Sequence, residues 1–485
     1  GVATPAAQTV GSNVAITTIV LSTSNNLAGT TYAWTRDNTA NATGFPASGT
    51  GDISGVFNNV TGTDQVVTFT IIPTSADGCL GDPFTATVTV HPEPVGVATP
   101  AAQTVCSDDV ITTIVLSTSN NLAGTTYAWT RDNLLNATGI PTSGSGDISG
   151  ILNNVTSSMQ TVIFTITPVS VDGCTGDLFN AVVNVNPEPI GAAVPALQTV
   201  CSSVPVTTVV FSTVNNLPGS TFAWVRDNTA NVTGMPASGS GDISGTLVNL
   251  TGVIQTVTFT VTPSSAIGCA GDPFTVVIVV EPEPFTYNIN GGGSFCAGEI
   301  GVVVGLDGSQ IGKLYQLMID GVLSGPLVGG TGFAVTFGYQ TTGGVYTILA
   351  TDPVNGCTSI MNGSVTVTVN PLPAVYAMIG GGAYCSGGAG VDVGLAGSDL
   401  GVDYTLYLYG VNTGLTVSGT GTAISFGNQT LTGTYTVGAI NVTTGCQQMM
   451  GGSVTVTISP KPIAFNVTGG GNYCTGGPGV VVGLD

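Results

Sequence analysis

The sequence predicts an all-β protein, a tandem array of small β-sandwich domains that forms an elongated rod. The first observation behind this is self-similarity. A shift of 95 residues carries Cys79 onto Cys174 and Cys269, and a second unit of 89 residues carries Cys296 onto Cys385. The second observation is a pattern of short strands that returns in every unit. Self-similarity at domain length indicates several small domains and not one large core.

Proline tripeptides mark the ends of the units, as Pro-Glu-Pro, Pro-Leu-Pro or Pro-Lys-Pro. Proline fixes φ and shortens the flexible linker, so these tripeptides are the expected boundaries. They define repeats 1, 2 and 3 of a first type, repeats 4 and 5 of a second type, and the start of a further, truncated repeat of the second type: 1–94, 95–189, 190–284, 285–373, 374–462 and 463–485. The last letters, GVVVGLD, repeat 301–307, so we expect the chain to be a window onto a longer protein.

The strands are predicted from residues that alternate along the chain. In FTATVTV of repeat 1, Ala86, Val88 and Val90 share one face, while threonines occupy the other. Outward threonine keeps the β propensity and stays wettable. No segment shows a sustained helical period. About seven short strands in 90–95 residues, with turns rich in Gly, Asn, Ser and Asp between them, are typical of an immunoglobulin-like sandwich.

Aromatic residues support the same fold. The single tryptophan of each first-type repeat falls where the third strand would place it in the core between two sheets. These residues are Trp34, Trp129 and Trp224. In the second type, Tyr346 and Tyr435 begin the penultimate strand, which is the position of a tyrosine corner.

The charge balance restricts the partners. Five Lys and Arg stand against 26 Asp and Glu, which gives a net charge of −21. Nucleic acids and anionic membranes both require a basic face, so neither is expected to bind. No apolar run approaches the roughly 18–20 residues of a membrane helix, so we expect no membrane insertion in this segment.

Residues suited to catalysis are scarce, and we predict that the chain is not an enzyme and uses no cofactor. The sole histidine, His91, takes an outward strand position and is predicted to be a plain surface residue. Gly-Gly-Gly runs begin at Gly291, Gly380 and Gly469. A nucleotide-binding glycine loop is followed by a helix, and no helix is expected after these runs. We interpret them as bends in the first strand.

Ten cysteines recur at fixed places, which predicts disulfides and an oxidising compartment. No close pair of the kind that binds zinc is present. The cysteines expected in disulfides are Cys106, Cys174, Cys201, Cys269, Cys296, Cys357, Cys385 and Cys446.

Their connectivity has two main alternatives. An internal bridge would join the two cysteines of one repeat, such as Cys106 and Cys174. Their turns would lie at opposite poles of a sandwich, roughly 30 Å apart, whereas a disulfide needs Cα atoms within about 7 Å. A head-to-tail stack would instead join neighbouring repeats, through Cys106–Cys269, Cys201–Cys357 and Cys296–Cys446. Both alternatives stay open, with a preference for the neighbour pairing; pairing across a linker, as in Cys79–Cys106, ranks last.

One cysteine must lack its expected partner under either alternative. Gly11 stands where later repeats have cysteine. The thiol left over is Cys174 under the neighbour pairing and Cys79 under the internal bridge.

Three further candidates concern ligands or modification. Asp82 and Glu93 are candidates for calcium at domain junctions, because hard cations need several oxygen ligands; solvated turn carboxylates are the alternative. Tyr407 and Tyr409, which share a face in YTLYLYG, are the best exposed candidates for glycan contact. Asn-x-Thr triplets are candidate glycosylation sites at Asn41, Asn59, Asn136, Asn154, Asn231 and Asn249.

The frames D-G-C-x-G-D-x-F…V-x-P-x-P and G-G-G-x-[FY]-C…T-G-C…G-S-V-T-V-T-V-x-P-x-P resemble tandem PKD-like and Ig-like repeats. Such repeats occur in very large surface adhesins of Bacteroidota, including the SprB-type gliding-motility adhesins exported by type IX secretion. The resemblance covers the whole chain. It implies an extracellular filament, anchored to the cell surface elsewhere in the parent chain, and it carries over no catalytic residues.

The preferred function is therefore a structural stalk of a bacterial surface adhesin or filament, which acts through length and stiffness. Its partners would be neighbouring repeats of the same chain, and surface polysaccharide or other cells. Two alternatives are repeats that bind glycans themselves, and a filament subunit that donates a strand to its neighbour.

Overall fold

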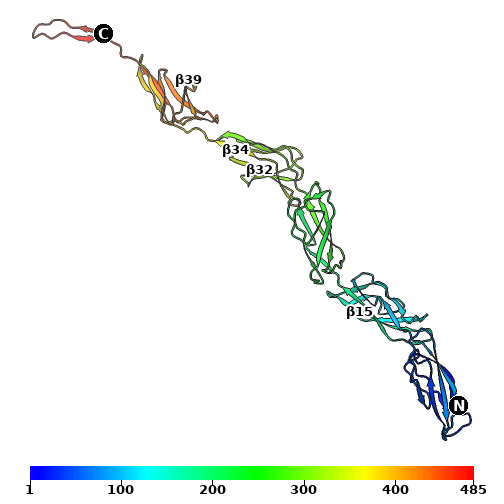
Figure 1. Ribbon diagram of the computed structural model, residues 1–485. Helices are drawn as coiled ribbons and strands as arrows, with labels where there is room; N and C mark the ends of the chain where they lie inside the picture. Colours follow the sequence, from blue (N-terminus) through cyan, green and yellow to red (C-terminus); the bar gives the residue numbers. More distant parts are fainter. The chain divides into compact units, whose positions relative to one another are not determined.

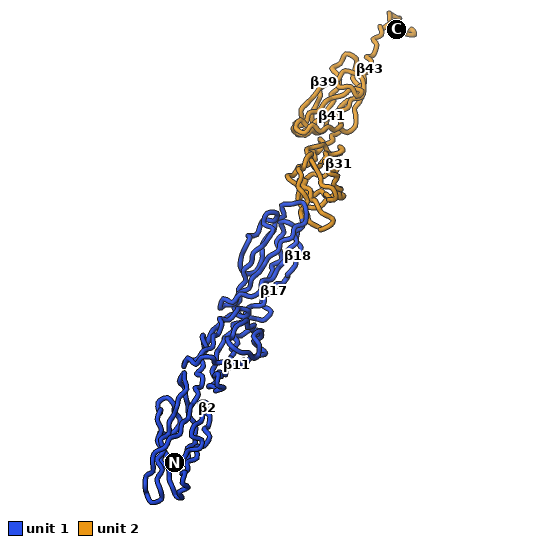
Figure 2. Tube along the Cα trace, turned by 90° about the vertical axis from the view of Figure 1, so that its right-hand side faces the viewer, with its two compact units in different colours: residues 1–281 blue, residues 282–485 orange.

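The computed structural model describes residues 1–485, with 45 strands and no helix (Figure 1). The predicted all-β fold of tandem immunoglobulin-like sandwiches is confirmed. The chain divides into two compact units, Gly1–Glu281 and Pro282–Asp485, coloured separately in Figure 2. All strands of repeats 1 to 3 lie in the first unit, and those of repeats 4 and 5 lie in the second. Nowhere does the chain form a helix with the length and apolar character of a membrane span.

Repeat 1 combines a five-stranded sheet, in the order β2-β7-β6-β4-β5, with the pair β1-β3. β2 runs parallel to β7, whereas the other pairings of the repeat are antiparallel. The first strand thus begins in one sheet as β1 and continues in the other as β2. The strands are β1 (Val2–Thr4), β2 (Ala7–Gly11), β3 (Val20–Ser22), β4 (Thr31–Arg36), β5 (Ser48–Thr50), β6 (Gln65–Thr74) and β7 (Phe84–His91).

Repeats 2 and 3 follow the same plan and add one short pair each, β12-β14 and β21-β23. Repeat 2 contains β8 (Gly96–Thr99), β9 (Ala102–Cys106), β10 (Val115–Thr118), β11 (Thr126–Arg131), β12 (Ala137–Gly139), β13 (Ser143–Ser145), β14 (Leu152–Asn154), β15 (Gln160–Val169) and β16 (Phe179–Asn186). Repeat 3 contains β17 (Gly191–Val194), β18 (Leu197–Cys201), β19 (Val210–Thr213), β20 (Thr221–Arg226), β21 (Val232–Thr233), β22 (Ser238–Ser240), β23 (Val248–Asn249), β24 (Gln255–Ser264) and β25 (Phe274–Glu281).

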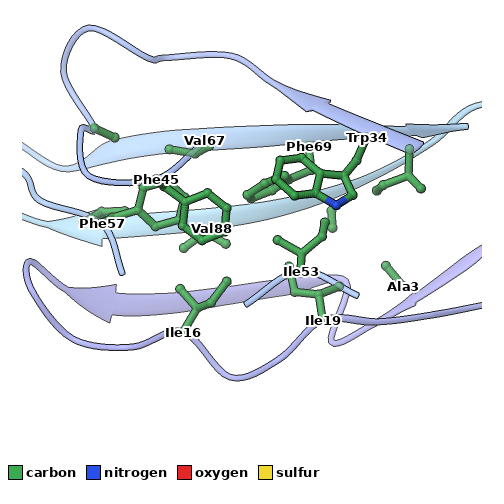
Figure 3. Packing of buried hydrophobic residues seen from close by; sticks show 14 of the residues in the cluster. Ala3, Ile16, Ile19, Trp34, Phe45, Ile53, Phe57, Val67, Phe69 and Val88 are labelled. Carbon is green, nitrogen blue, oxygen red and sulfur yellow. The ribbon is translucent and has the colours of Figure 1, made fainter. Parts of the chain in front are cut away.

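Alternation along the strands builds the core of each sandwich. On β7, Ala86, Val88 and Val90 are buried, as predicted. Figure 3 shows ring side chains of one layer facing Ile19 and Ile53 of the other. The tryptophans occupy the predicted core position, each 7% exposed. Each large apolar side chain that is fully buried contributes about 1.5–3 kcal/mol.

Four of the five basic residues form hydrogen bonds or ion pairs with buried or partly buried groups. Arg36 is buried and donates from Nη2 to Phe45 O (2.6 Å) and from Nε to Pro46 O (2.9 Å). Burial lowers its pKa, against the opposing effect of Asp37. Arg131 and Arg226 make the same kind of bonds. In the second unit, Lys313 pairs with the buried Asp352, and Lys461 alone remains exposed. The outer surface therefore carries almost no positive charge.

Repeats 4 and 5 each combine a three-stranded and a larger sheet, β26-β28-β31 with β27-β34-β32-β29-β30 in repeat 4, and β35-β37-β40 with β36-β43-β41-β38-β39 in repeat 5. Repeat 4 contains β26 (Ile289–Gly291), β27 (Gly293–Cys296), β28 (Val302–Leu306), β29 (Leu314–Ile319), β30 (Val322–Gly329), β31 (Val335–Gln340), β32 (Gly344–Thr351), β33 (Thr358–Ile360) and β34 (Val365–Asn370). Repeat 5 contains β35 (Met378–Gly380), β36 (Gly382–Cys385), β37 (Val391–Leu395), β38 (Val402–Leu408), β39 (Val411–Ser418), β40 (Ile424–Gln429), β41 (Gly433–Asn441), β42 (Gln447–Met449) and β43 (Val454–Ser459). The last residues form the hairpin-like pair β44 (Val467–Gly469) and β45 (Val482–Leu484).

Two predictions about the second type are confirmed. The Gly-Gly-Gly run of repeat 4 bends the first strand from one sheet to the other, and Gly291 has φ 89°. A Cβ there would lie 2.0 Å from Val303 O, so only glycine fits. The tyrosine corners are also present: Tyr346 Oη donates to Thr342 O (2.8 Å), and Tyr435 Oη donates to Leu431 O (2.9 Å).

Candidate functional site

Cysteines, carboxylates and the sole histidine meet at junctions between repeats. Within one repeat the two cysteine positions lie at opposite ends of the sandwich. In repeat 2, Cys106 ends β9 opposite Asn186, the last residue of β16. Cys174 lies in the turn that precedes the start of β16. A strand of eight residues therefore separates them, about 26 Å at 3.3 Å per residue.

Disulfides join neighbouring repeats. Cys106 of repeat 2 is bonded to Cys269 of repeat 3, with Cα atoms 5.6 Å apart. Cys296 of repeat 4 is bonded to Cys446 of repeat 5, with Cα atoms 5.5 Å apart. For these four cysteines the structure has the neighbour pairing and not the internal bridge, because a turn near the end of one repeat meets the end of the first strand of the repeat before it.

Two of the cysteines expected in disulfides, Cys174 and Cys385, are free thiols. Cys174 is the thiol that the neighbour pairing leaves over, whereas for Cys385 the expectation is wrong. Cys174 is buried and faces Gly11, which has no side chain to offer; a Cβ there would lie 2.7 Å from Cys174 Sγ. Cys385 is exposed. Of the remaining cysteine positions, Cys201 ends β18 and Cys357 lies between β32 and β33.

Linker prolines pack tightly on the repeat that follows. A Cβ on Gly176 of repeat 2 would lie 2.0 Å from Pro94 O, and one on Gly271 of repeat 3 would lie 1.9 Å from Pro189 O. The second glycine of the recurring G-C-x-G-D frame therefore permits a close approach of two backbones. The sequence contains this signal, but its meaning depends on the position of the preceding linker.

An asparagine of each following repeat also holds the linker. Asn120 Nδ2 donates to Glu93 O (2.9 Å) and to Thr61 O (3.0 Å), both in repeat 1. Its counterpart Asn215 donates to Glu188 O (2.8 Å) in repeat 2. The same amide group therefore recurs at successive junctions of the first unit.

The calcium candidates of repeat 1 do not lie together. Glu93 is buried, and its carboxylate accepts from Asn13 Nδ2 (2.5 Å) and Asn58 Nδ2 (3.2 Å). Asp82 is exposed beside Cys79, near the opposite end of the sandwich. A whole strand separates the two residues within repeat 1, and calcium at the domain junctions stays a prediction.

Their counterparts do approach one another across the next junction. Glu188 of repeat 2 lies near Asp108 and Asp109 of its own repeat and near Asp272 of repeat 3. Burial raises the pKa of Glu188 to about 7, with further contributions from the hydrogen bond with Asp108 and from the charges of Asp108, Asp272 and Asp109. Asn13 occupies the position of Asp108 in repeat 1, so this repulsion has no counterpart at the first junction.

A histidine and two aspartates meet at the first junction. His91 Nδ1 lies 2.8 Å from Asp64 Oδ1 in repeat 1 and 3.8 Å from Asp172 Oδ2 in repeat 2. The three potential ligand atoms lie within 4.8 Å of one another. His91 takes the predicted outward strand position, where its side chain is 26% exposed and faces both carboxylates. Beside this group, a cavity of about 370 Å³ is lined by Gly11, Asp172 and Cys174 among others.

The two tyrosines predicted for glycan contact do not share a face. Tyr407 lies on β38 beside Gly438 of the neighbouring β41, where a Cβ would meet its ring at 3.1 Å. Strand β38 ends at Leu408, and Tyr409 has φ 49°, which turns it out of the strand. Alternation stops at that turn, so the expectation of one shared platform is wrong.

Half of the Asn-x-Thr asparagines serve the fold. Asn59, Asn154 and Asn249 are buried, and each donates from Nδ2 to a carbonyl of the last strand in its repeat; Asn59 does so to Val90 O at 2.8 Å. The other three are exposed at Asn41, Asn136 and Asn231. Only the exposed set is accessible to modification.

The fold and these junctions define a class of protein: a tandem array of immunoglobulin-like sandwiches joined by short proline linkers. The chain belongs to the PKD-like domain family, whose model matches residues 8–94, 103–189 and 198–284. A comparison with curated proteins finds no match.

Several solved structures with low sequence identity are similar. The N-terminal eight Ig domains of Down Syndrome Cell Adhesion Molecule align over 100% of this chain and 64% of that chain, with 12% identity and TM-score 0.26. An ICAM-5 D1–D4 ectodomain fragment covers 75% of this chain and 99% of its own, with 13% identity and TM-score 0.27. Drosophila N-cadherin EC1–4 covers 75% and 98%, with 8% identity and TM-score 0.21.

Proposed function

We propose that the chain is a structural stalk of an extracellular surface adhesin or filament, and that it acts through the length and stiffness of its repeats. One observation carries the proposal: the disulfides Cys106–Cys269 and Cys296–Cys446 join one sandwich to the next. A bridge within a sandwich would stabilise that sandwich alone. A bridge between sandwiches restrains their mutual orientation, which is useful only where that orientation matters.

The chemistry of the surface supports a role outside the cell. Disulfides persist in oxidising compartments. A surface with a single exposed cation, Lys461, and a net charge of −21 keeps the chain apart from nucleic acids and anionic lipids. Surface attachment, gliding motility and type IX export follow from the resemblance to Bacteroidota adhesins, and they form the finer part of the proposal.

Solution scattering of the 485-residue chain tests the stalk. Five sandwiches in line, each about 35–40 Å long, would give a largest dimension of about 200 Å. We expect this value under oxidising conditions and a shorter, broader distance distribution after Cys106, Cys269, Cys296 and Cys446 are changed to serine. The matched control changes the free thiols Cys79 and Cys174 to serine and should leave the distribution unchanged. An oxidised chain that scatters as freely jointed beads would overturn the proposal.

Attachment assays on the source cell test the biological part. Removal of repeats 2 and 3 from the parent chain should reduce attachment or gliding, and a glycine-serine linker of equal contour length should not restore it. Restoration by the flexible linker would show that stiffness is not the activity.

A second candidate function is glycan binding by repeat 5, which one feature favours. A cavity of about 390 Å³ opens beside Tyr407 and is lined by Thr405, Gln447, Gln448 and Met449 among others. The aromatic ring offers a stacking face, and the amides offer donors and acceptors. Gly438 leaves this space open, whereas repeat 4 has a leucine at the equivalent position.

A glycan array with Tyr407→Ala and Gly438→Leu tests this candidate, because the first removes the ring and the second fills the cavity. Both changes should abolish a signal carried by the cavity. Tyr409→Ala is the control and should retain it. A signal insensitive to both changes would place the glycan elsewhere.

A further inference from the structure

We propose that Asp64, His91 and Asp172 form a binding site for a zinc-type divalent cation that clamps repeat 1 to repeat 2. Asp64 precedes β6, His91 ends β7, and Asp172 lies in the turn after β15 of the next repeat. The site thus draws on both sides of a junction. It is independent of the stalk function, since an ion can bind here whatever the repeats do.

The geometry suits a tetrahedral ion. Zinc takes histidine nitrogen and carboxylate oxygen at about 2.0–2.2 Å, which places neighbouring ligand atoms about 3.3 Å apart. His91 Nδ1 lies 2.8 Å from Asp64 Oδ1 and 3.8 Å from Asp172 Oδ2, on either side of that spacing. Side-chain exposures of 26% for His91, 49% for Asp64 and 39% for Asp172 leave room for a water as fourth ligand. The adjoining cavity, which Asp172 also lines, provides access.

The charges around the site favour a cation. Asp64 and Asp172 approach the same imidazole from different repeats, and two carboxylates at this distance repel one another. The basic side chains of the first unit are Arg36, Arg131 and Arg226, and all three are buried and bonded to backbone carbonyls. None of them is available to neutralise the pair, so a bound divalent ion is the natural counter-charge.

The ligand set also indicates which ion binds. Imidazole with carboxylates suits zinc and its first-row neighbours, whereas calcium needs six or more oxygen ligands. A single nitrogen and two carboxylates do not provide that number.

Sequence differences among the repeats separate this junction from the next. Repeat 2 has Met159 and Asn186 where repeat 1 has Asp64 and His91, and repeat 3 has Ile267 where repeat 2 has Asp172. Repeat 2 therefore lacks both of the ligands that repeat 1 provides. Repeat 1 has them at the one junction of the first unit where a glycine, Gly11, replaces the bridging cysteine.

The sole histidine makes the test direct, because the imidazole ¹⁵N resonances of the chain arise from His91 alone. The full chain, with the exposed Cys79, Cys385 and Cys474 changed to serine to remove competing thiols, is titrated with Zn²⁺. We expect one equivalent to bind, a large shift of the Nδ1 resonance, and a higher unfolding temperature of the first unit. His91→Asn, which places the residue of repeat 2, should weaken Zn²⁺ binding at least tenfold.

The control is Asp77→Asn, the repeat 1 counterpart of Asp172, which should bind as the parent does. Asp172→Asn should weaken Zn²⁺ binding although Asp64 and His91 stay in place. This result would show that the site needs the ligand from repeat 2. An unshifted Nδ1 resonance at saturating Zn²⁺, or equal binding by His91→Asn, would overturn the proposal. Tighter binding of Ca²⁺ than of Zn²⁺ would overturn it as well.

Discussion

The two junctions of the first unit connect nearly identical sandwiches by different means. Between repeats 2 and 3, Cys106 and Cys269 form a disulfide, and Glu188 lies among carboxylates. Between repeats 1 and 2, Gly11 faces a free Cys174, and Asn13 satisfies the carboxylate of Glu93. The linker contacts, through Gly176 or Gly271, are the same at both.

This difference separates what positions the repeats from what fixes them. The proline linker, the close glycine contact and the asparagine amide recur at both junctions, so they suffice to bring the two cysteine positions together. The disulfide is added to an arrangement that exists without it, because Gly11 still lies against Cys174. Covalent strength can therefore vary along the array while the geometry stays constant.

Loss of the disulfide should have the largest effect. Cys106→Ser with Cys269→Ser removes a bridge that spans 163 residues, and bridges of this kind contribute about 3 kcal/mol. We expect the unfolding temperature of the first unit to fall in calorimetry, and reductant to produce the same fall in the parent. Cys79→Ser changes an exposed free thiol at the equivalent position and should have no effect. An equal loss from the control would contradict the role of the bridge.

Gly11→Cys should create the missing bridge. Gly11 lies on β2, and a Cβ at this position would lie 2.7 Å from Cys174 Sγ. That separation is close to the roughly 3 Å between a Cβ and the distal sulfur of a disulfide, so we expect spontaneous oxidation. The gain should be about 2 kcal/mol and should be lost on reduction. Thiol titration checks the result, because the Gly11→Cys variant would have one free thiol fewer than the parent, through the loss of Cys174.

The matched control for this bridge is Gly11→Ser. It places the same Cβ beside Cys174 without a bond and should stabilise nothing. A gain in Gly11→Ser equal to that in Gly11→Cys would show that side-chain packing, and not the covalent link, strengthens the junction.

The carboxylates at the second junction should make stability depend on pH. The pKa of Glu188 is raised from its ordinary 4.5 to about 7, so the folded chain holds this proton more tightly than the unfolded chain. The stabilisation is complete below pH 4.5 and is lost as pH rises through 7. Because solvent screens the group, we expect a loss of about 1 kcal/mol between about pH 5 and pH 8.

Asp108→Asn tests this, because it places the residue type of Asn13 beside Glu188. Urea unfolding at the two pH values should show a smaller difference than in the parent. Asp177→Asn removes a carboxylate that does not face Glu188 and should keep the full difference. An unchanged difference in Asp108→Asn would show that these carboxylates do not interact.

The asparagine amides should give the smallest effect. Asn120→Ala removes hydrogen bonds to Glu93 O and Thr61 O, and we expect a loss of about 1 kcal/mol. Asn215→Ala removes the bond to Glu188 O and should cost about half as much. Urea unfolding of the two variants measures the order. A larger loss from Asn215→Ala would mean that the junction of repeats 2 and 3, which has the disulfide, depends more on its asparagine than the junction of repeats 1 and 2 does.

The sequence predicts what local periodicity determines. Alternation identifies the buried face of β7, and chain position identifies Trp34 and the corner residue Tyr346. The orientation of Tyr409 is not predicted by alternation, because a positive φ at this residue ends the strand before it. Alternation of residue types does not indicate where a strand ends. The burial of Asn59 is not predicted either, because its hydrogen-bond acceptor, Val90 O, lies on a strand far along the chain.

The junctions are harder to predict because their geometry depends on two repeats at once. Neighbour and internal disulfides use the same cysteines, so composition cannot separate them. His91 and Asp172 belong to different repeats, and no spacing within one repeat relates them. The available signal is the joint departure of Asp64 and His91 from the residues of repeats 2 and 3.

Covalent links between one sandwich and the next are the central claim. Peptide mapping of the unreduced chain by mass spectrometry tests them directly. We predict a peptide that contains Cys106 linked to one that contains Cys269, and a peptide that contains Cys296 linked to one that contains Cys446. Cys106 linked to Cys174, or Cys296 linked to Cys357, would contradict the claim.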